Sequence, residues 1–128
     1  MTIKLNTQHK ALIIEDTAEL AEILRITMTN MGIETFTAFH GRKAIDFIQT
    51  HRPDLILLDI GLPDMSGWKV LETLEQLDIA LPKIVVISAF SDPANRLVGK
   101  LQGVNSYLIK PFTTQEVEAV VQKVLQTE

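Results

Sequence analysis

One short segment restricts the fold of this chain more than any other: the apolar run Leu55–Leu58, which ends on Asp59. The run lies between Pro53 and Gly61, and its continuous Leu and Ile residues are typical of a strand that is buried on both faces. A carboxylate at the end of such a strand is costly to bury unless a cation, a hydrogen bond or water is nearby. We therefore predict a central strand here and treat Asp59 as a candidate functional residue, the alternative being a solvent-exposed aspartate in a turn.

Similar apolar runs alternate with helical patterns along the rest of the chain. Strands are expected at residues 11–14, 33–38, 55–59, 84–87 and 106–109. Amphipathic helices are expected at residues 17–31 and about 40–50, from 66 onward, at 92–103, and from 113 onward. The helix at 92–103 is the weakest, because Gly99 lies inside it and few of its residues are apolar. This alternation predicts an α/β fold: a doubly wound, five-stranded parallel sheet, flavodoxin-like (βα)5, with strand order 2-1-3-4-5.

The bulk composition excludes several other classes of protein. A chain of 128 residues fits one domain, and we expect residues 1–9 to form a flexible tail and residues 10–128 to form the domain. The formal net charge of −4 argues against a nucleic-acid partner, and the lack of cysteine excludes disulfides and thiol chemistry. No apolar run approaches the length of a membrane span, so we expect a cytoplasmic protein without a membrane partner.

Polar residues follow four of the expected strands. Glu15 and Asp16 follow the first strand, Asp59 ends the third, Ser88 follows the fourth and Lys110 follows the fifth. In a doubly wound sheet these ends meet at one edge, where ligands bind. Three carboxylates placed together repel unless a cation joins them, and an oxygen-only ligand set favours Mg²⁺.

The remaining two polar residues, Ser88 and Lys110, are suited to an anion. Together with Mg²⁺ they would hold a phosphoryl group, and Asp59 would then be a nucleophile that forms an aspartyl phosphate. A flavin or nucleotide is the competing ligand for this fold. The loop at residues 15–19 contains Glu15, Asp16 and Glu19, which would repel a phosphate, so a flavodoxin-type ligand is disfavoured.

These residues carry a resemblance to a known family. From about residue 10 to residue 126, the chain resembles the receiver domain of two-component response regulators. The matching segments are Glu15-Asp16, Asp59 to Gly67, Ser88-Ala89 and Tyr107 to Phe112. The resemblance implies a phosphoacceptor signalling domain that catalyses only its own phosphorylation and dephosphorylation, and is not otherwise an enzyme.

The resemblance also implies roles for individual residues. Asp59 would accept a phosphoryl group from a histidine kinase or a histidine phosphotransfer protein. Mg²⁺ would be held by Asp16, Asp59 and the backbone carbonyl of Gly61, with Glu15 contributing. Ser88 and Lys110 would contact the phosphoryl oxygens, and the peptide bond from Lys110 to Pro111 would be cis.

Two features depart from the usual pattern of that family. Glu15 stands where aspartate is common, which should preserve Mg²⁺ binding through altered water contacts. Gly61 and Phe90 occupy the two positions that tune phosphate lifetime in the family, and neither has a polar side chain to position an attacking water. We therefore predict a long-lived aspartyl phosphate, and a measured half-life of seconds would contradict this.

The resemblance implies a switch as well. Ser88 would move toward the phosphoryl group, and Tyr107 would fill the space behind it. The output surface would then comprise the fourth helix, fifth strand and fifth helix. We expect a stand-alone, single-domain response regulator, monomeric or weakly homodimeric, that acts on a downstream protein the sequence does not identify. A phosphate-independent pseudo-receiver and, less favoured, a flavodoxin-type small-ligand binder are the alternatives.

Overall fold

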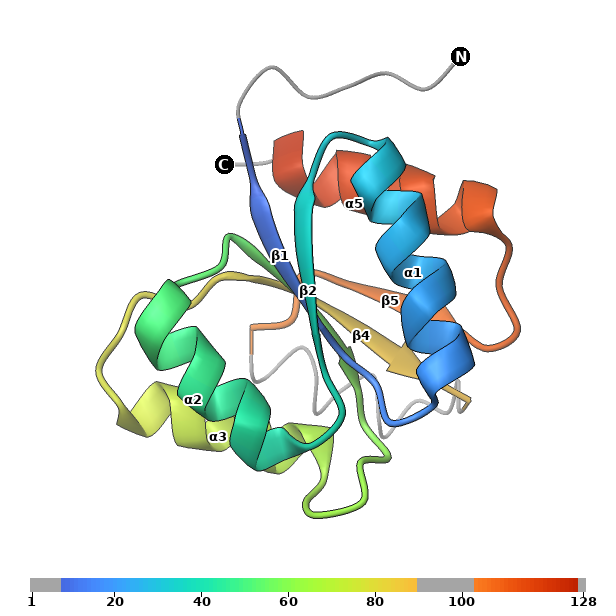
Figure 1. Ribbon diagram of the computed structural model, residues 1–128. Helices are drawn as coiled ribbons and strands as arrows, with labels where there is room; N and C mark the ends of the chain where they lie inside the picture. Colours follow the sequence, from blue (N-terminus) through green and yellow to red (C-terminus); the bar gives the residue numbers. More distant parts are fainter. Residues whose placement is uncertain (1–7, 90–102, 127–128) are drawn as a thin grey trace.

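A five-stranded parallel sheet forms the centre of the computed structural model, which describes residues 8–89 and 103–126 (Figure 1). The strands lie in the order β2-β1-β3-β4-β5, as predicted. Their bounds are β1 Lys10–Ile14, β2 Glu34–Ala38, β3 Leu55–Asp59, β4 Lys83–Ser88 and β5 Ser106–Ile109. The helices of the described part are α1 Ala18–Asn30, α2 Gly41–His51, α3 Gly67–Gln76 and α5 Thr114–Gln126.

Some sequence-based predictions concern residues outside the described ranges. The helix predicted at 92–103 lies outside them except for Gly103, and Phe90 and residues 1–7 lie outside them as well. None of the helices that can be described is long and apolar enough to cross a membrane.

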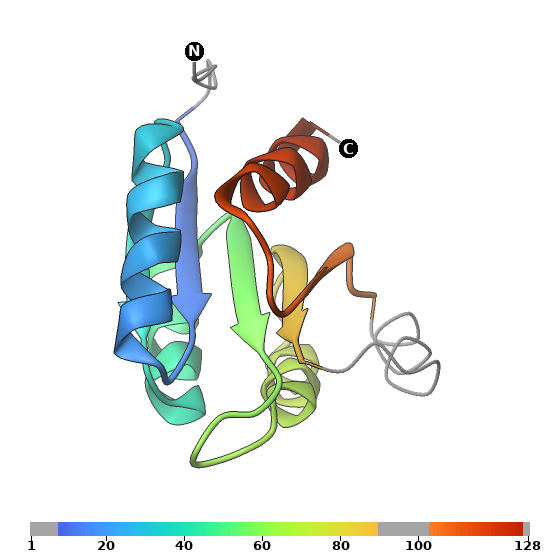
Figure 2. The same cartoon turned by 90° about the vertical axis from the view of Figure 1, so that its right-hand side faces the viewer.

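The two faces of the sheet are covered by different helices. Figure 1 shows α1 and α5 on one face and α2 and α3 on the other, and Figure 2 shows the same layers from the side. Leu55 and Leu57 of β3 belong to the apolar cluster under α1 and α5, while Ile56 and Leu58 belong to the cluster under α2 and α3. Burial on both faces explains why this strand is continuously apolar rather than alternating.

The last helix begins at a reciprocal cap. The amide of Glu116 donates to the hydroxyl of Thr113 at 3.1 Å, and the Glu116 carboxylate accepts from the amide of Thr113 at 3.2 Å. This capping box satisfies amide groups that have no partner within the helix. The helix expected from residue 113 onward is confirmed, with Thr113 as its cap.

Candidate functional site

The carboxyl ends of the strands lie along one edge of the sheet (Figure 2). β3 runs beside β4 with Asp59 opposite Ile87, and β4 runs beside β5 with Ser88 opposite Ile109. A cavity of about 260 Å³ opens at this edge. It is lined by Asp16, Asp59, Ile60, Gly61, Ser88, Ala89 and Lys110.

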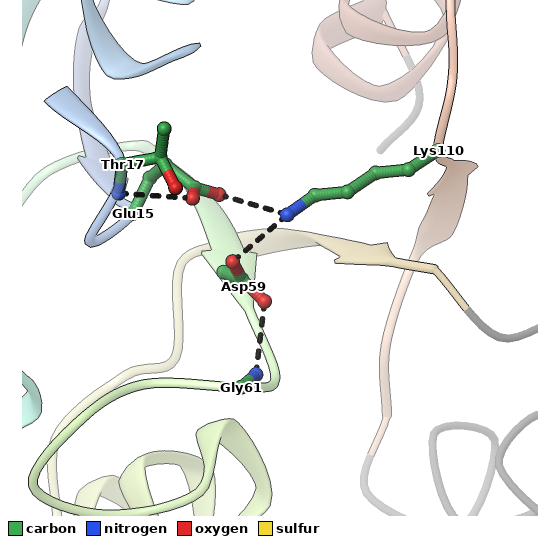
Figure 3. A network of polar contacts seen from close by, with 5 residues as sticks. All are labelled: Glu15, Thr17, Asp59, Gly61 and Lys110. Atoms are coloured by element: carbon green, nitrogen blue, oxygen red, sulfur yellow. Dashed lines mark hydrogen bonds and ion pairs between the residues drawn. The ribbon is translucent and has the colours of Figure 1, made fainter. Parts of the chain in front are cut away.

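Lys110 connects the acidic residues of the site (Figure 3). Its ammonium donates to Oδ2 of Asp59 at 3.1 Å and forms an ion pair with Oε2 of Glu15 at 3.5 Å. The other oxygens of the two carboxylates accept backbone hydrogen bonds, Oδ1 of Asp59 from Gly61 at 2.9 Å and Oε1 of Glu15 from Thr17 at 3.2 Å. The carboxylates at the ends of β1 and β3 are therefore held facing the lysine that follows β5.

The two carboxyl groups of this network have pKa values that are shifted in opposite directions. Glu15 is 0% exposed, and burial together with the neighbouring Asp59 raises the pKa of Glu15 to about 7. Burial also acts to raise the pKa of Asp59, but contacts with Glu15, the Gly61 amide and Lys110 lower it overall. Burial acts to lower the pKa of Lys110, yet Asp59 and Glu15 raise it overall. In the metal-free protein, Glu15 is therefore the carboxyl group of this pair that retains a proton to higher pH, and Asp59 is the one that ionises first.

The acids also fit a metal ion. Glu15, Asp16 and Asp59 each offer one carboxylate oxygen, and these three atoms lie within 4.8 Å of one another. Among the described residues, Oε2 of Glu15 is buried without a hydrogen-bond partner. A hard cation bound by oxygen ligands, such as Mg²⁺, would satisfy that atom and favour the ionised form of Glu15.

The structure brings together the residues that the sequence singled out. Glu15, Asp16, Asp59 and Lys110 form the cluster described above, and Ser88 and Gly61 line the same cavity. The peptide bond from Lys110 to Pro111 is cis, as the resemblance implied.

Tyr107, the predicted switch partner of Ser88, lies two residues before Ile109, which is the residue opposite Ser88. It sits on β5 opposite Val86, is half-buried, and contacts the apolar cluster under α2 and α3. It is therefore not a fully exposed strand residue.

Sequence reasoning missed one residue next to the site. The carboxylate of Asp64 accepts hydrogen bonds from the amides of Gly41 and Arg42 at 2.8 and 3.0 Å. Asp64 follows Pro63 in a loop, where an aspartate is common, and its partners are 23 and 22 residues away. No local pattern could have identified such a contact.

A doubly wound sheet with acids and a lysine at its carboxyl edge is the arrangement found in phosphoacceptor domains of signalling proteins. The chain belongs to the response regulator receiver domain family, whose model matches residues 11–122. It is 35% identical over 114 residues to the DNA-binding response regulator MtrA of Mycolicibacterium paratuberculosis, covering 89% of this chain and 50% of that protein. It is 31% identical over 117 residues to the alkaline phosphatase synthesis transcriptional regulatory protein PhoP of Bacillus subtilis, covering 91% and 48%.

Solved structures give the same result. The chemotaxis protein CheY4 of Vibrio cholerae superposes with a TM-score of 0.85 at 26% identity, over 92% of this chain and 99% of that one. A two-component response regulator from Clostridium difficile superposes with a TM-score of 0.86 at 28% identity, over 93% and 97%. The chain spans about half the length of the curated relatives that it matches.

Proposed function

We propose that this domain accepts a phosphoryl group on Asp59 in a Mg²⁺-dependent reaction, and that the donor is a histidine kinase or a histidine phosphotransfer protein. The observation that carries the proposal is the state of Asp59. This carboxylate is buried, has a lowered pKa, and lies 3.1 Å from Lys110 in a cavity that it shares with Asp16, beside the buried Glu15. An ionised oxygen beside a fixed cation is what a nucleophile for a phosphoryl group requires.

The transfer exchanges one bond for another. A carboxylate oxygen of Asp59 forms a bond to phosphorus while the bond from phosphorus to the donor imidazole nitrogen breaks, and the imidazole leaves. Asp16, Asp59 and the Gly61 carbonyl, with Glu15 contributing, would hold Mg²⁺, which when bound would neutralise charge on the phosphoryl oxygens. Lys110 already contacts Asp59 and needs little displacement to contact a phosphoryl oxygen on it.

The signal would leave the site through β4 and β5. Ser88 is 3% exposed at the end of β4 and lines the cavity, so its hydroxyl can contact a phosphoryl oxygen. Tyr107 lies on the next strand, two residues before the position opposite Ser88, and would follow the movement of Ser88. The surface of β5 and α5 then forms the described part of the proposed output face for a downstream protein.

Several finer expectations stay predictions. They are the stand-alone organisation, the boundary at residue 10, the cytoplasmic location, the monomeric or weakly dimeric state and the long-lived phosphate. The expected absence of a nucleic-acid partner is not supported by the comparisons, because MtrA is named a DNA-binding response regulator. DNA binding is stated of MtrA as a whole, and this chain matches 50% of that protein.

Intact-mass analysis after incubation with acetyl phosphate and Mg²⁺ tests the proposal. We expect one added phosphoryl group on the native protein, none on Asp59→Asn, and none when Mg²⁺ is removed with EDTA. No adduct on the native protein with excess donor would favour the phosphate-independent pseudo-receiver. A flavin or nucleotide retained through purification would favour the small-ligand binder.

A further inference from the structure

The first turn of α2 is capped by a residue distant in sequence. His40 precedes this helix, and within the part of the chain that the structure describes its side chain makes no capping hydrogen bond. The amides of Gly41 and Arg42 donate instead to Oδ1 and Oδ2 of Asp64, which lies in the loop between β3 and α3. Helix amides at this position have no partner within the helix, so one carboxylate satisfies two of them and joins two separate segments.

The same loop is fixed at further points. Gly61 and Ser66 pair as an isolated antiparallel bridge, and the amide of Gly67 donates to the carbonyl of Ile60 at 2.8 Å. The start of α2 also fits closely against it, since a Cβ atom added at Gly41 would lie 2.6 Å from Cγ of Met65. Residues 60–66 are thus closed on themselves and clamped to α2 by Asp64.

This clamped loop begins at the candidate site. Its Gly61 lines the cavity and donates its amide to Oδ1 of Asp59 at 2.9 Å. A loop that is held at both ends and at its middle has few conformations to lose when a ligand binds. Release of the Asp64 contact would let the loop sample other conformations, in which the Gly61 backbone is displaced from Asp59.

We propose that Asp64 is a positioning residue, which holds the Gly61 backbone beside Asp59 for the binding of Mg²⁺ by clamping the loop at residues 60–66 to the start of α2. The proposal rests on the proposed function, because it concerns the ion expected at that site. Under this proposal, Asp64 does more than stabilise the start of α2. The Thr113 cap of α5, by contrast, is bonded to its own helix, and Thr113 is not among the residues that line the cavity.

The test compares Asp64→Ala and Asp64→Asn with Thr113→Ala, which removes a cap of similar kind at a distance from the loop. Calorimetric titration with Mg²⁺ gives the affinity, and NMR hydrogen exchange reports the amides of Gly41, Arg42 and Gly61. We expect Asp64→Ala to weaken Mg²⁺ binding by about tenfold, the lower end of the range for groups that support metal ligands, and to speed exchange at all three amides. Asp64→Asn keeps one acceptor oxygen and should fall between Asp64→Ala and the native protein, while Thr113→Ala should bind Mg²⁺ as the native protein does.

The outcomes separate this inference from the proposed function. Native affinity in Asp64→Ala, with faster exchange confined to Gly41 and Arg42, would reduce Asp64 to a helix cap and overturn the inference. If Asp64→Ala does not fold, Asp64→Asn decides: affinity equal to that of Thr113→Ala overturns the inference, and weaker affinity supports it. Failure of the native protein to bind Mg²⁺ would instead count against the proposed function.

Discussion

The interior of β3 and its carboxyl end differ sharply although they are adjacent in one strand. Leu55 to Leu58 are each 0% exposed and belong to the two apolar clusters of the core. Asp59, the next residue, is 6% exposed, yet it is charged and faces Lys110 and Glu15. Burial of these four apolar side chains stabilises the fold, whereas burial of the Asp59 charge costs free energy that its partners must offset. Stability and chemistry therefore belong to different residues of the same strand, and substitutions should separate them.

The largest expected effect is that of Asp59→Asn on phosphorylation. We expect complete loss of labelling by acetyl phosphate, because an amide is not a nucleophile for phosphorus. The free energy of unfolding in metal-free buffer at pH 7.5 should change much less than in a core substitution, because removal of the charge beside Glu15 and weakening of the contacts with Lys110 and the Gly61 amide act in opposite directions. Urea unfolding followed by the fluorescence of Trp68, the single tryptophan, measures this. A loss of stability as large as that of a core substitution would contradict the claim that stability and chemistry belong to different residues of β3.

Leu57→Ala should have the opposite profile. Truncation of this fully buried side chain should lower the free energy of unfolding by about 2–5 kcal/mol, because it leaves a cavity under α1 and α5. The folded fraction should still be labelled at the native rate. Urea unfolding and intact-mass kinetics under conditions where the variant is folded would check both parts. Slow labelling of the folded variant would show that the interior of β3 also affects the chemistry at Asp59.

Glu15→Gln should change the way in which the stability of the metal-free protein depends on pH. In metal-free protein the pKa of Glu15 is about 7, against 4.5 as its ordinary value, so the folded state binds more protons than the unfolded state between these pH values. The stability of the native protein should therefore fall as the pH rises through this window, and the loss should be on the order of 2 kcal/mol. Glutamine cannot lose a proton there, so the variant should lack this loss. Urea unfolding in EDTA from pH 5 to pH 8 measures the difference, and parallel profiles for the two proteins would contradict the assignment of the proton to Glu15.

Thr113→Ala should have the smallest effect. Loss of the α5 cap should lower the free energy of unfolding by about 1 kcal/mol without changing the rate of labelling, because the cap lies outside the cavity. Thr114→Ala, a substitution of the adjacent exposed threonine in the first turn of α5, is the matched control and should be close to neutral. Equal losses in both variants would mean that the capping box contributes little.

Much of the site could be predicted because its residues follow strands that the sequence identifies by local pattern. The continuous apolar run of Leu55–Leu58 indicated burial on both faces, and parallel strands necessarily bring Asp59 and Lys110 to one edge. The position of the proton on Glu15 depends on burial and on distances between three strands, which no local pattern contains. The contact of Asp64 with α2 likewise joins elements that are distant in sequence, so only the folded chain reveals it.

The most direct test of the account identifies the phosphorylated residue itself. Borohydride reduces an acyl phosphate to an alcohol, so treatment of the phosphorylated protein should convert the labelled aspartate to homoserine. Peptide mapping by mass spectrometry then locates the change. We predict homoserine at position 59 and nowhere else, formed only when Mg²⁺ was present during labelling. Homoserine at position 16 or 64, or an unchanged Asp59 in protein that carries a phosphoryl group, would contradict it.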